Sequence, residues 1–285
     1  MIASFQPYRF HSLSMLSKIL PVFPAELFRH RELLWQFTVR SVELRHKGSH
    51  LGLVWSVLNP LLMLGLYVFV FGYIFEGKFG VLPNETRADY GFGIFLGLAL
   101  FQFVAEVMGV SPNVIVGNPN FVKKVVFPLE ILPAANVGAA AFHLLISLGL
   151  VFVGLITFDR TIHWELFWLP IIILPLVMFS LGIAWFCSAL GVFLRDIGQL
   201  MQFLTMALMY SSAVFFSATK IPDALWTFMR FNPVLLSIES ARNTALWAQP
   251  MNYHHLIYLY GIGLLTCILG HTAFKRMRPA FADVL

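Results

Sequence analysis

Charged residues are scarce in this chain of 285 residues, since Asp, Glu, Lys and Arg together make up only 12% of it. Ordinary soluble domains carry about twice that share, so a soluble globular class is excluded. Cysteine is equally scarce: Cys187 and Cys267 are the only two, and both lie inside apolar runs. They are expected to be small buried hydrophobes, which excludes a disulfide scaffold or a cysteine metal site.

The motifs of common catalytic sites are missing as well. The chain has no Gly-x-x-x-x-Gly-Lys-Ser/Thr loop, so it is not expected to bind and hydrolyse ATP by itself. It has neither His-Glu-x-x-His nor Gly-x-Ser-x-Gly, and its nine histidines show no metal-ligand spacing. The sequence therefore predicts no enzyme, no catalytic residues, no metal and no cofactor on this chain.

Long apolar runs are what the chain has instead. Six of them carry one formal charge between them, Glu106, and each is long enough to cross a hydrocarbon core of about 30 Å as a helix. The sequence predicts an all-α polytopic membrane protein with six transmembrane helices, at about residues 51–75, 90–110, 131–158, 166–194, 197–219 and 253–274.

The basic residues predict the orientation. An even number of spans places both termini on one side, and thirteen Lys and Arg residues then lie on that side against six on the other. This is the positive-inside bias, so both termini are expected in the cytoplasm. Because these charges lie where anionic lipid headgroups would attract them, membrane lipid is the expected partner and nucleic acid is not.

The spacing of polar residues predicts a helix over residues 26–47, but this helix is too polar to cross the membrane. Polar residues recur every three or four positions and make one stripe, while apolar residues cover most of the remaining surface. We expect an amphipathic interface helix whose stripe faces water or a partner; a plain membrane-surface anchor is the alternative. The stripe includes Arg29, Glu32, Arg40, Glu43 and Lys47.

Two further segments lie outside the spans. Residues 118–128 are basic and bracketed by prolines, which predicts a short helix that inserts into another protein, or else a polar turn held by lysines. Residues 221–249 are too charged to span yet rich in Leu, Phe and Trp. Asn232-Pro233 divides them into two amphipathic pieces, which predicts re-entrant helices at the external mouth before the last span.

Glu106 is the only Asp or Glu within the six runs. Ionisable groups in membranes are costly and usually functional, which would suit proton coupling, but one carboxylate alone favours a structural or gating role. Near the cytoplasmic third of its helix, Glu106 could reach water or pair with Arg195. Arg195 and Asp196 join it as candidate gating or structural residues.

Several separated motifs resemble one family in their order along the chain. The motifs are Arg31–Arg40, Arg45–Gly52, Trp55–Leu61, Asn118–Pro128, Phe193–Ile197 and Phe231–Leu235. Together they resemble the membrane subunit of type-2 ATP-binding-cassette exporters of cell-surface polysaccharide, the O-antigen and teichoic-acid permeases. The resemblance covers about Phe28 to the C-terminus, which makes residues 26–285 the type-2 transmembrane domain and leaves residues 1–25 as an arm without an assigned role.

The resemblance implies an export machine in the cytoplasmic (inner) membrane. Two permease copies would pair with two copies of a separate ATPase, which would bind ATP and Mg²⁺, and would export a polymer on an undecaprenyl-type lipid. Residues 118–128 look like the family's coupling helix, and 26–47 like its interface helix. The residues implied in coupling are Asn118, Asn120, Phe121, Lys123, Lys124 and Phe127.

Aromatic side chains suit the passage of sugars, because pyranose faces stack on rings in weak, repeated contacts. Six aromatic residues on the first and fifth spans are candidate channel residues, although most aromatics of a membrane protein face lipid or core. They are Tyr67, Phe71, Tyr73, Tyr210, Phe215 and Phe216. Two other functions stay open: a type-2 permease for a small lipid, glycolipid or drug, and a secondary carrier or intramembrane enzyme that works without an ATPase.

Overall fold

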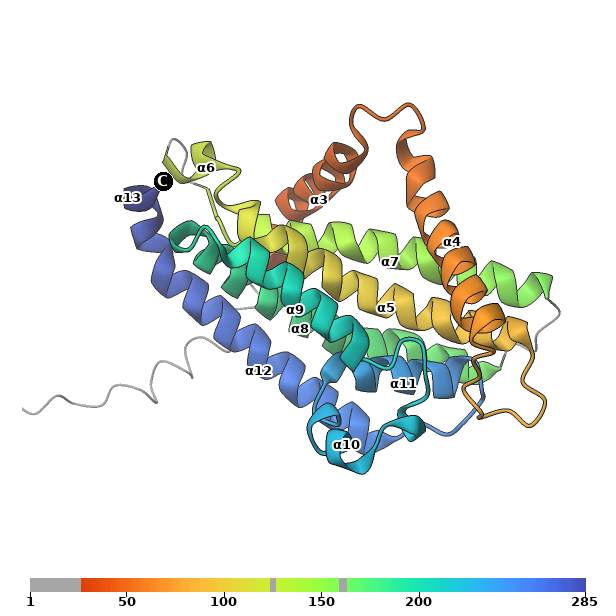
Figure 1. The fold of residues 1–285 in the computed structure, drawn as a ribbon. Helices are drawn as coiled ribbons and strands as arrows, with labels where there is room; N and C mark the ends of the chain where they lie inside the picture. The colour runs from red at the N-terminus through yellow and green to blue at the C-terminus, as the bar shows by residue number, and fades with distance from the viewer. Residues whose placement is uncertain (1–26, 124–126, 159–162) are drawn as a thin grey trace, which may run out of the picture.

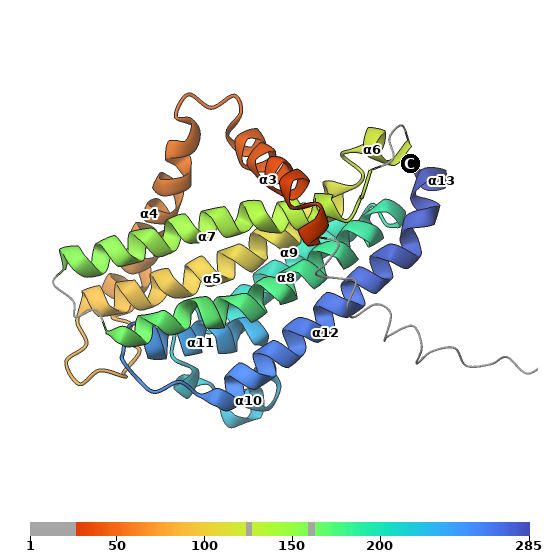
Figure 2. The same ribbon diagram turned by 180° about the vertical axis from the view of Figure 1, so that it is seen from behind.

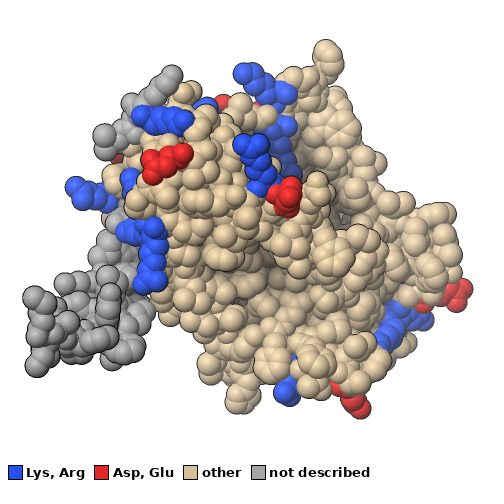
Figure 3. Space-filling view, turned by 60° about the vertical axis from the view of Figure 1, so that its left-hand side comes forward, with Lys and Arg blue, Asp and Glu red and all other residues tan. Residues whose placement is uncertain are grey.

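A computed structural model describes residues 27–123, 127–158 and 163–285, and these residues form helices joined by turns and loops, with no strand. Five long helical stretches are apolar enough to cross a membrane: Gly52–Ile74, Arg87–Val114, Ile131–Thr157, Trp164–Phe193 and Tyr253–Val284. The chain is therefore a polytopic membrane protein. On the face in Figure 3, charged side chains gather at two opposite ends, and a broad uncharged band separates them.

The centre of the bundle is α5 (Arg87–Val114): 78% of the residues in its most apolar stretch are buried, against 6% of those in the most apolar stretch of Gly52–Ile74. It packs against α7 (Ile131–Thr157), α8 (Trp168–Phe193) and α9 (Ile197–Ser211), as Figures 1 and 2 show from opposite sides. A capping box starts α5, because Thr86 accepts from the backbone N–H of Asp89 while Asp89 accepts from that of Thr86.

The most extensive helix contact joins α8 to α12 (Tyr253–Met277). Glycines permit it: a Cβ on Gly182 would collide with the carbonyl of Thr266, and one on Gly270 with the carbonyl of Gly182. Small residues let transmembrane helices approach backbone to backbone, where packing rather than the hydrophobic effect drives association. A short 3₁₀ turn, η5 (Arg278–Ala280), and α13 (Phe281–Val284) follow α12.

The first helices stand apart from this bundle. Helix α3 (Arg31–His46) packs on α7 and turns through η1 (Gly52–Val54) into α4 (Trp55–Tyr67), so that the two form an inverted V in Figure 1. Helix α4 continues as a π-helix, η2 (Val68–Ile74). Within this first span only Ser56 and Gly72 are buried among the described residues, and the others are half-buried or exposed.

The expected fifth span, residues 197–219, is interrupted. Helix α9 ends at Ser211 after 15 residues, roughly 22 Å, which is short of the roughly 30 Å that a span needs. An irregular stretch follows, with φ of 50° at Ala213, and then η4 (Ala218–Lys220). The prediction of six continuous spans is therefore corrected to five long spans and one shorter helix.

Side chains from elsewhere in the chain stabilise this non-helical stretch by donating hydrogen bonds to its backbone carbonyls. Arg242 donates to the carbonyl oxygens of Ala213 and Val214, and Tyr90 Oη donates to that of Phe215 at 2.9 Å. The amide of Asn232 donates to the carbonyl of Ser211 at 3.1 Å. Non-helical backbone at membrane depth is tolerated where protein groups satisfy it, and these three donors do so.

Residues 221–249 contain two helices, α10 (Asp223–Met229) and α11 (Pro233–Ala245). They separate at Asn232, which caps α11 by accepting from the N–H of Val234 and of Leu235. Pro233 follows at the first helical position, where its missing N–H costs nothing. Figure 1 places both helices at the end of the bundle away from α6 (Pro119–Lys123) and α13.

Candidate functional site

Glu106 lies where α3, α5 and α7 meet, and it is paired. Its carboxylate, 4% exposed, forms an ion pair with Arg45 of α3 and lies 3.0 Å from Nδ1 of His143 on α7. Of the two alternatives for Glu106, water or Arg195, the pairing with Arg195 is wrong: α3 folds back along α7 and brings Arg45 to the carboxylate, whereas Arg195 is exposed at the turn between α8 and α9. Asp196 is exposed at the same turn.

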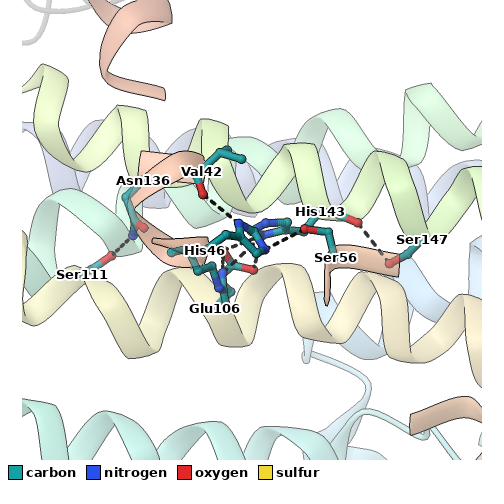
Figure 4. Close-up of polar contacts among 9 residues, drawn as sticks. Val42, His46, Ser56, Glu106, Ser111, Asn136, His143 and Ser147 are labelled. Atoms are coloured by element: carbon teal, nitrogen blue, oxygen red, sulfur yellow. Dashed lines mark hydrogen bonds and ion pairs between the residues drawn. The ribbon is translucent and has the colours of Figure 1, made fainter. Parts of the chain in front are cut away.

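A second histidine extends the network toward the first span (Figure 4). His46 contacts the carbonyl of Val42 through Nδ1 at 2.9 Å and the hydroxyl of Ser56 through Nε2 at 2.9 Å. Its ring meets that of His143 edge-on, with centroids 5.8 Å apart. The network therefore links the α3–α4 turn to the most buried helix by polar contacts.

A cavity of about 430 Å³ adjoins this network between α4, α5 and α7. Its lining includes the polar side chains of Arg45, Glu106 and His143, and also Tyr67 and Met209. Nε2 of His143 is buried and has no hydrogen-bond partner in the described residues. Among those residues, no group of three or more His, Cys, Asp or Glu side chains is placed to hold a metal ion.

Three of the six predicted channel residues come together. Phe215 stacks on Phe71 at 4.5 Å between centroids with an interplanar angle of 12°, and its ring lies 4.8 Å from that of Tyr67. Phe215 is buried by this packing, so it is a core residue of the isolated chain. Phe216, the next residue in the sequence, is half-buried.

The two remaining channel candidates lie on the surface. Tyr210 and Tyr73 are each 56% exposed. The Tyr73 ring lies 4.4 Å below the guanidinium of Arg87, in a cation–π contact. Neither ring therefore joins the cluster of Tyr67, Phe71 and Phe215.

The expected coupling element contains α6, and it rests on α3. The rings of Phe37 and Phe121 are 5.4 Å apart, and both contact the buried ring of Phe127. The guanidinium of Arg40 lies over Phe121 at 5.9 Å. Asn120 and Lys123 are exposed, while Lys124 lies outside the described residues.

Two more predicted groups have clear positions. Asn118 closes the preceding helix by donating to the carbonyl of Val114 at 2.9 Å. The polar stripe of the interface helix is exposed along its length, at Arg29, Glu32, Arg40, Glu43 and Lys47.

The sequence did not predict that residues near the C-terminus pack on the coupling element. Arg278 donates to Glu130 Oε1 at 2.8 Å and to the carbonyl of Phe127 at 3.4 Å, and Phe281 is fully buried. It also missed Arg45 and Arg242 as partners of buried groups. One signal was present for the Glu106 network: His143 is a polar residue in the apolar run that follows the run of Glu106.

Comparison with known proteins places this arrangement among transporters. The chain is 28% identical over 257 residues to an O-antigen export system permease protein RfbA of Klebsiella pneumoniae, covering 89% of this chain and 95% of that protein. It is 24% identical to the protein of that name in Myxococcus xanthus, with 90% and 97% covered. It is 23% identical to the polysialic acid transport protein KpsM of Escherichia coli, with 85% and 92% covered.

A family description, ABC-2 type transporter, matches residues 32–246, which is most of the chain from α3 to the end of α11. The matched region includes the Glu106 network and the α6 element. The chain therefore belongs to the ABC-2 type transporter family, as a membrane permease subunit without an ATPase domain of its own.

Proposed function

We propose that this chain is the channel-forming permease of an exporter that carries a lipid-linked cell-surface polysaccharide, of O-antigen or teichoic-acid type, across the cytoplasmic membrane. The observation that carries the proposal is the set of relatives: the similarity to permeases named for O-antigen export and polysialic acid transport runs over 85–90% of this chain. Both termini would lie in the cytoplasm, as the distribution of basic residues favours.

An ABC-2 permease works with an ABC ATPase subunit, which binds the ATP. We assign the contact to the end of the molecule that carries α3, α6 and α13, where Asn120 and Lys123 are exposed. The proposed assembly has two permease copies and two ATPase copies. The exposure of the first span supports a second copy beside it, since only 6% of the residues in its most apolar stretch are buried within the chain.

The polymer would pass the aromatic cluster of Tyr67, Phe71 and Phe215, together with Tyr73, Tyr210 and Phe216. Rings that stack weakly on sugar faces permit both binding and release, as conduction requires. Residues 221–249 would form re-entrant helices at the external exit. Glu106 would act in gating or support, because Arg45 connects it directly to the helix next to the coupling element.

Deletion of the gene in its host tests the proposal. Cells without the chain should lose the polysaccharide from their surface and regain it on complementation. A tag on the chain should recover the ATPase subunit of the same cells, with ATP hydrolysis in the purified complex. Unchanged surface polysaccharide together with altered sensitivity to small amphiphiles would favour a permease for a small lipid or drug instead.

A further inference from the structure

A second cavity, of about 340 Å³, lies at the end of the molecule that carries α10 and α11. Three segments enclose it: residues 79–81 before α5, the interrupted stretch after α9, and one side of α11 with the turn that follows it. Two of the enclosing residues have a left-handed backbone, with φ of 76° at Gly80 and 50° at Ala213. The volume falls in the range of small-molecule sites, which starts at about 300 Å³.

Arg242 makes one wall of this cavity rigid. The guanidinium, in a residue only 3% exposed, donates from Nε to the carbonyl of Gly93 and from Nη1 to that of Ala213, both at 2.7 Å. It also donates to Val214 and lies 4.4 Å from the ring of Phe79. Because its donors are engaged by backbone, Arg242 serves to hold the walls together.

Glu239, one turn before Arg242 on α11, is the unusual group of the lining. Its Oε2 is buried and has no hydrogen-bond partner in the described part of the chain. Burial raises the pKa of the Glu239 carboxyl, and the nearby positive charge of Arg242 opposes that shift. A buried acceptor without a partner destabilises the folded protein, so a hydrogen-bond donor from a ligand would recover free energy.

The rest of the lining narrows the chemistry of that ligand. Asn243 and Gln249 add amide groups and Thr219 a hydroxyl, while Trp247, whose ring lies 5.4 Å from that of Phe79, adds an aromatic face. The positive charge of Arg242 disfavours a cationic ligand beside the single carboxylate of Glu239, and that carboxylate repels an anionic ligand. A neutral polyhydroxylated ring matches both the polar acceptors and the aromatic face.

We infer that this cavity binds one sugar residue of the exported polymer, with Glu239 accepting hydrogen bonds from its hydroxyl groups and Trp247 packing on its ring. The inference rests on the proposed function and gives it a site that the aromatic cluster near α4 does not include. The site lies at the end opposite α6, so it would meet the polymer on the external side.

Binding of released polymer to the purified complex tests the site. The probe is the surface polysaccharide of the host, freed from its lipid by mild acid, and the protein is the permease–ATPase complex in nanodiscs. Saturation-transfer NMR should detect binding to the wild type. Glu239→Gln and Trp247→Ala should each weaken it about tenfold, because a charge-assisted hydrogen bond or a stacked ring is lost.

Asp223→Asn is the matched control, since Asp223 is an exposed acidic residue of α10 at the same end and outside the cavity lining. Every variant must retain its ATPase subunit and its ATP hydrolysis, which shows that it is folded. Equal binding by the wild type, Glu239→Gln and Trp247→Ala would overturn the site. A wild type that binds no polymer, from cells that need the chain for surface polysaccharide, would also overturn it while leaving the proposed function intact.

Discussion

Arg45 of α3 and Glu106 of α5 form an ion pair between an exposed side chain and a buried one: 45% of the Arg45 side chain is accessible, against 4% of that of Glu106. The pair joins the helix that stands at the edge of the molecule to the helix at its centre. Replacing Glu106 would therefore leave an exposed charge without its partner, whereas replacing Arg45 would leave a buried one.

Arg45→Gln should lower stability more than Glu106→Gln does. Without Arg45, the buried carboxylate keeps His143 as its one partner among the described residues, whereas without Glu106 the exposed guanidinium turns to water. The measurement is the temperature at which half of the purified complex loses its fold. The double variant should lose less than the sum of the single losses, and strict additivity would contradict an interaction between the two side chains.

Arg242→Lys should destabilise the protein by more than about 3 kcal/mol, although the charge is kept. A lysine ammonium cannot donate in the planar fork that reaches the carbonyls of Gly93, Ala213 and Val214 together, so buried acceptors lose their donors. Arg230→Lys is the control, because Arg230 is exposed on the neighbouring segment. Equal behaviour of the two variants in heat denaturation would show that Arg242 does not hold the interruption after α9.

Gly270→Ala should loosen the contact of α8 with α12, because the new methyl group would collide with the carbonyl of Gly182. Gly261→Ala on the same helix meets nothing within 4 Å and should be neutral or slightly stabilising. The yield of monodisperse protein in detergent and its thermal denaturation measure the difference. Equal stability of the two variants would mean that the contact of α8 with α12 tolerates a side chain at Gly270.

Phe281→Ala should weaken binding of the ATPase at the end of the molecule that carries α6 and α13, without affecting membrane insertion. Phe281 is fully buried against Phe193 and Phe274, and its truncation leaves a cavity that costs about 3–5 kcal/mol if the site does not collapse. Recovery of the ATPase on a tagged permease should fall. Val284→Ala, at a residue 50% exposed, should leave recovery unchanged; a loss for both variants would point to the tail itself as the docking surface.

Composition alone predicts most of the membrane-spanning helices, because the absence of charge over twenty or more residues leaves few alternatives to a span. It fails after Ser211, where the sequence stays apolar but the backbone leaves the helix. The cause lies in Arg242 and Tyr90, which are distant in sequence and bind the carbonyls of that stretch. The partner of Glu106 was missed for a similar reason, since only the packing of α3 on α7 brings Arg45 to it.

The π-helix at Val68–Ile74 changes the angular spacing of the first span. The N–H of Phe75 bonds to the carbonyl of Val70 at 3.1 Å, five residues back, where an α-helix would use four. Each turn therefore holds an additional residue, and one face is shared by positions roughly four to five apart. An alanine scan along this span should show sensitive positions every three or four residues up to Tyr67, and a longer period beyond it.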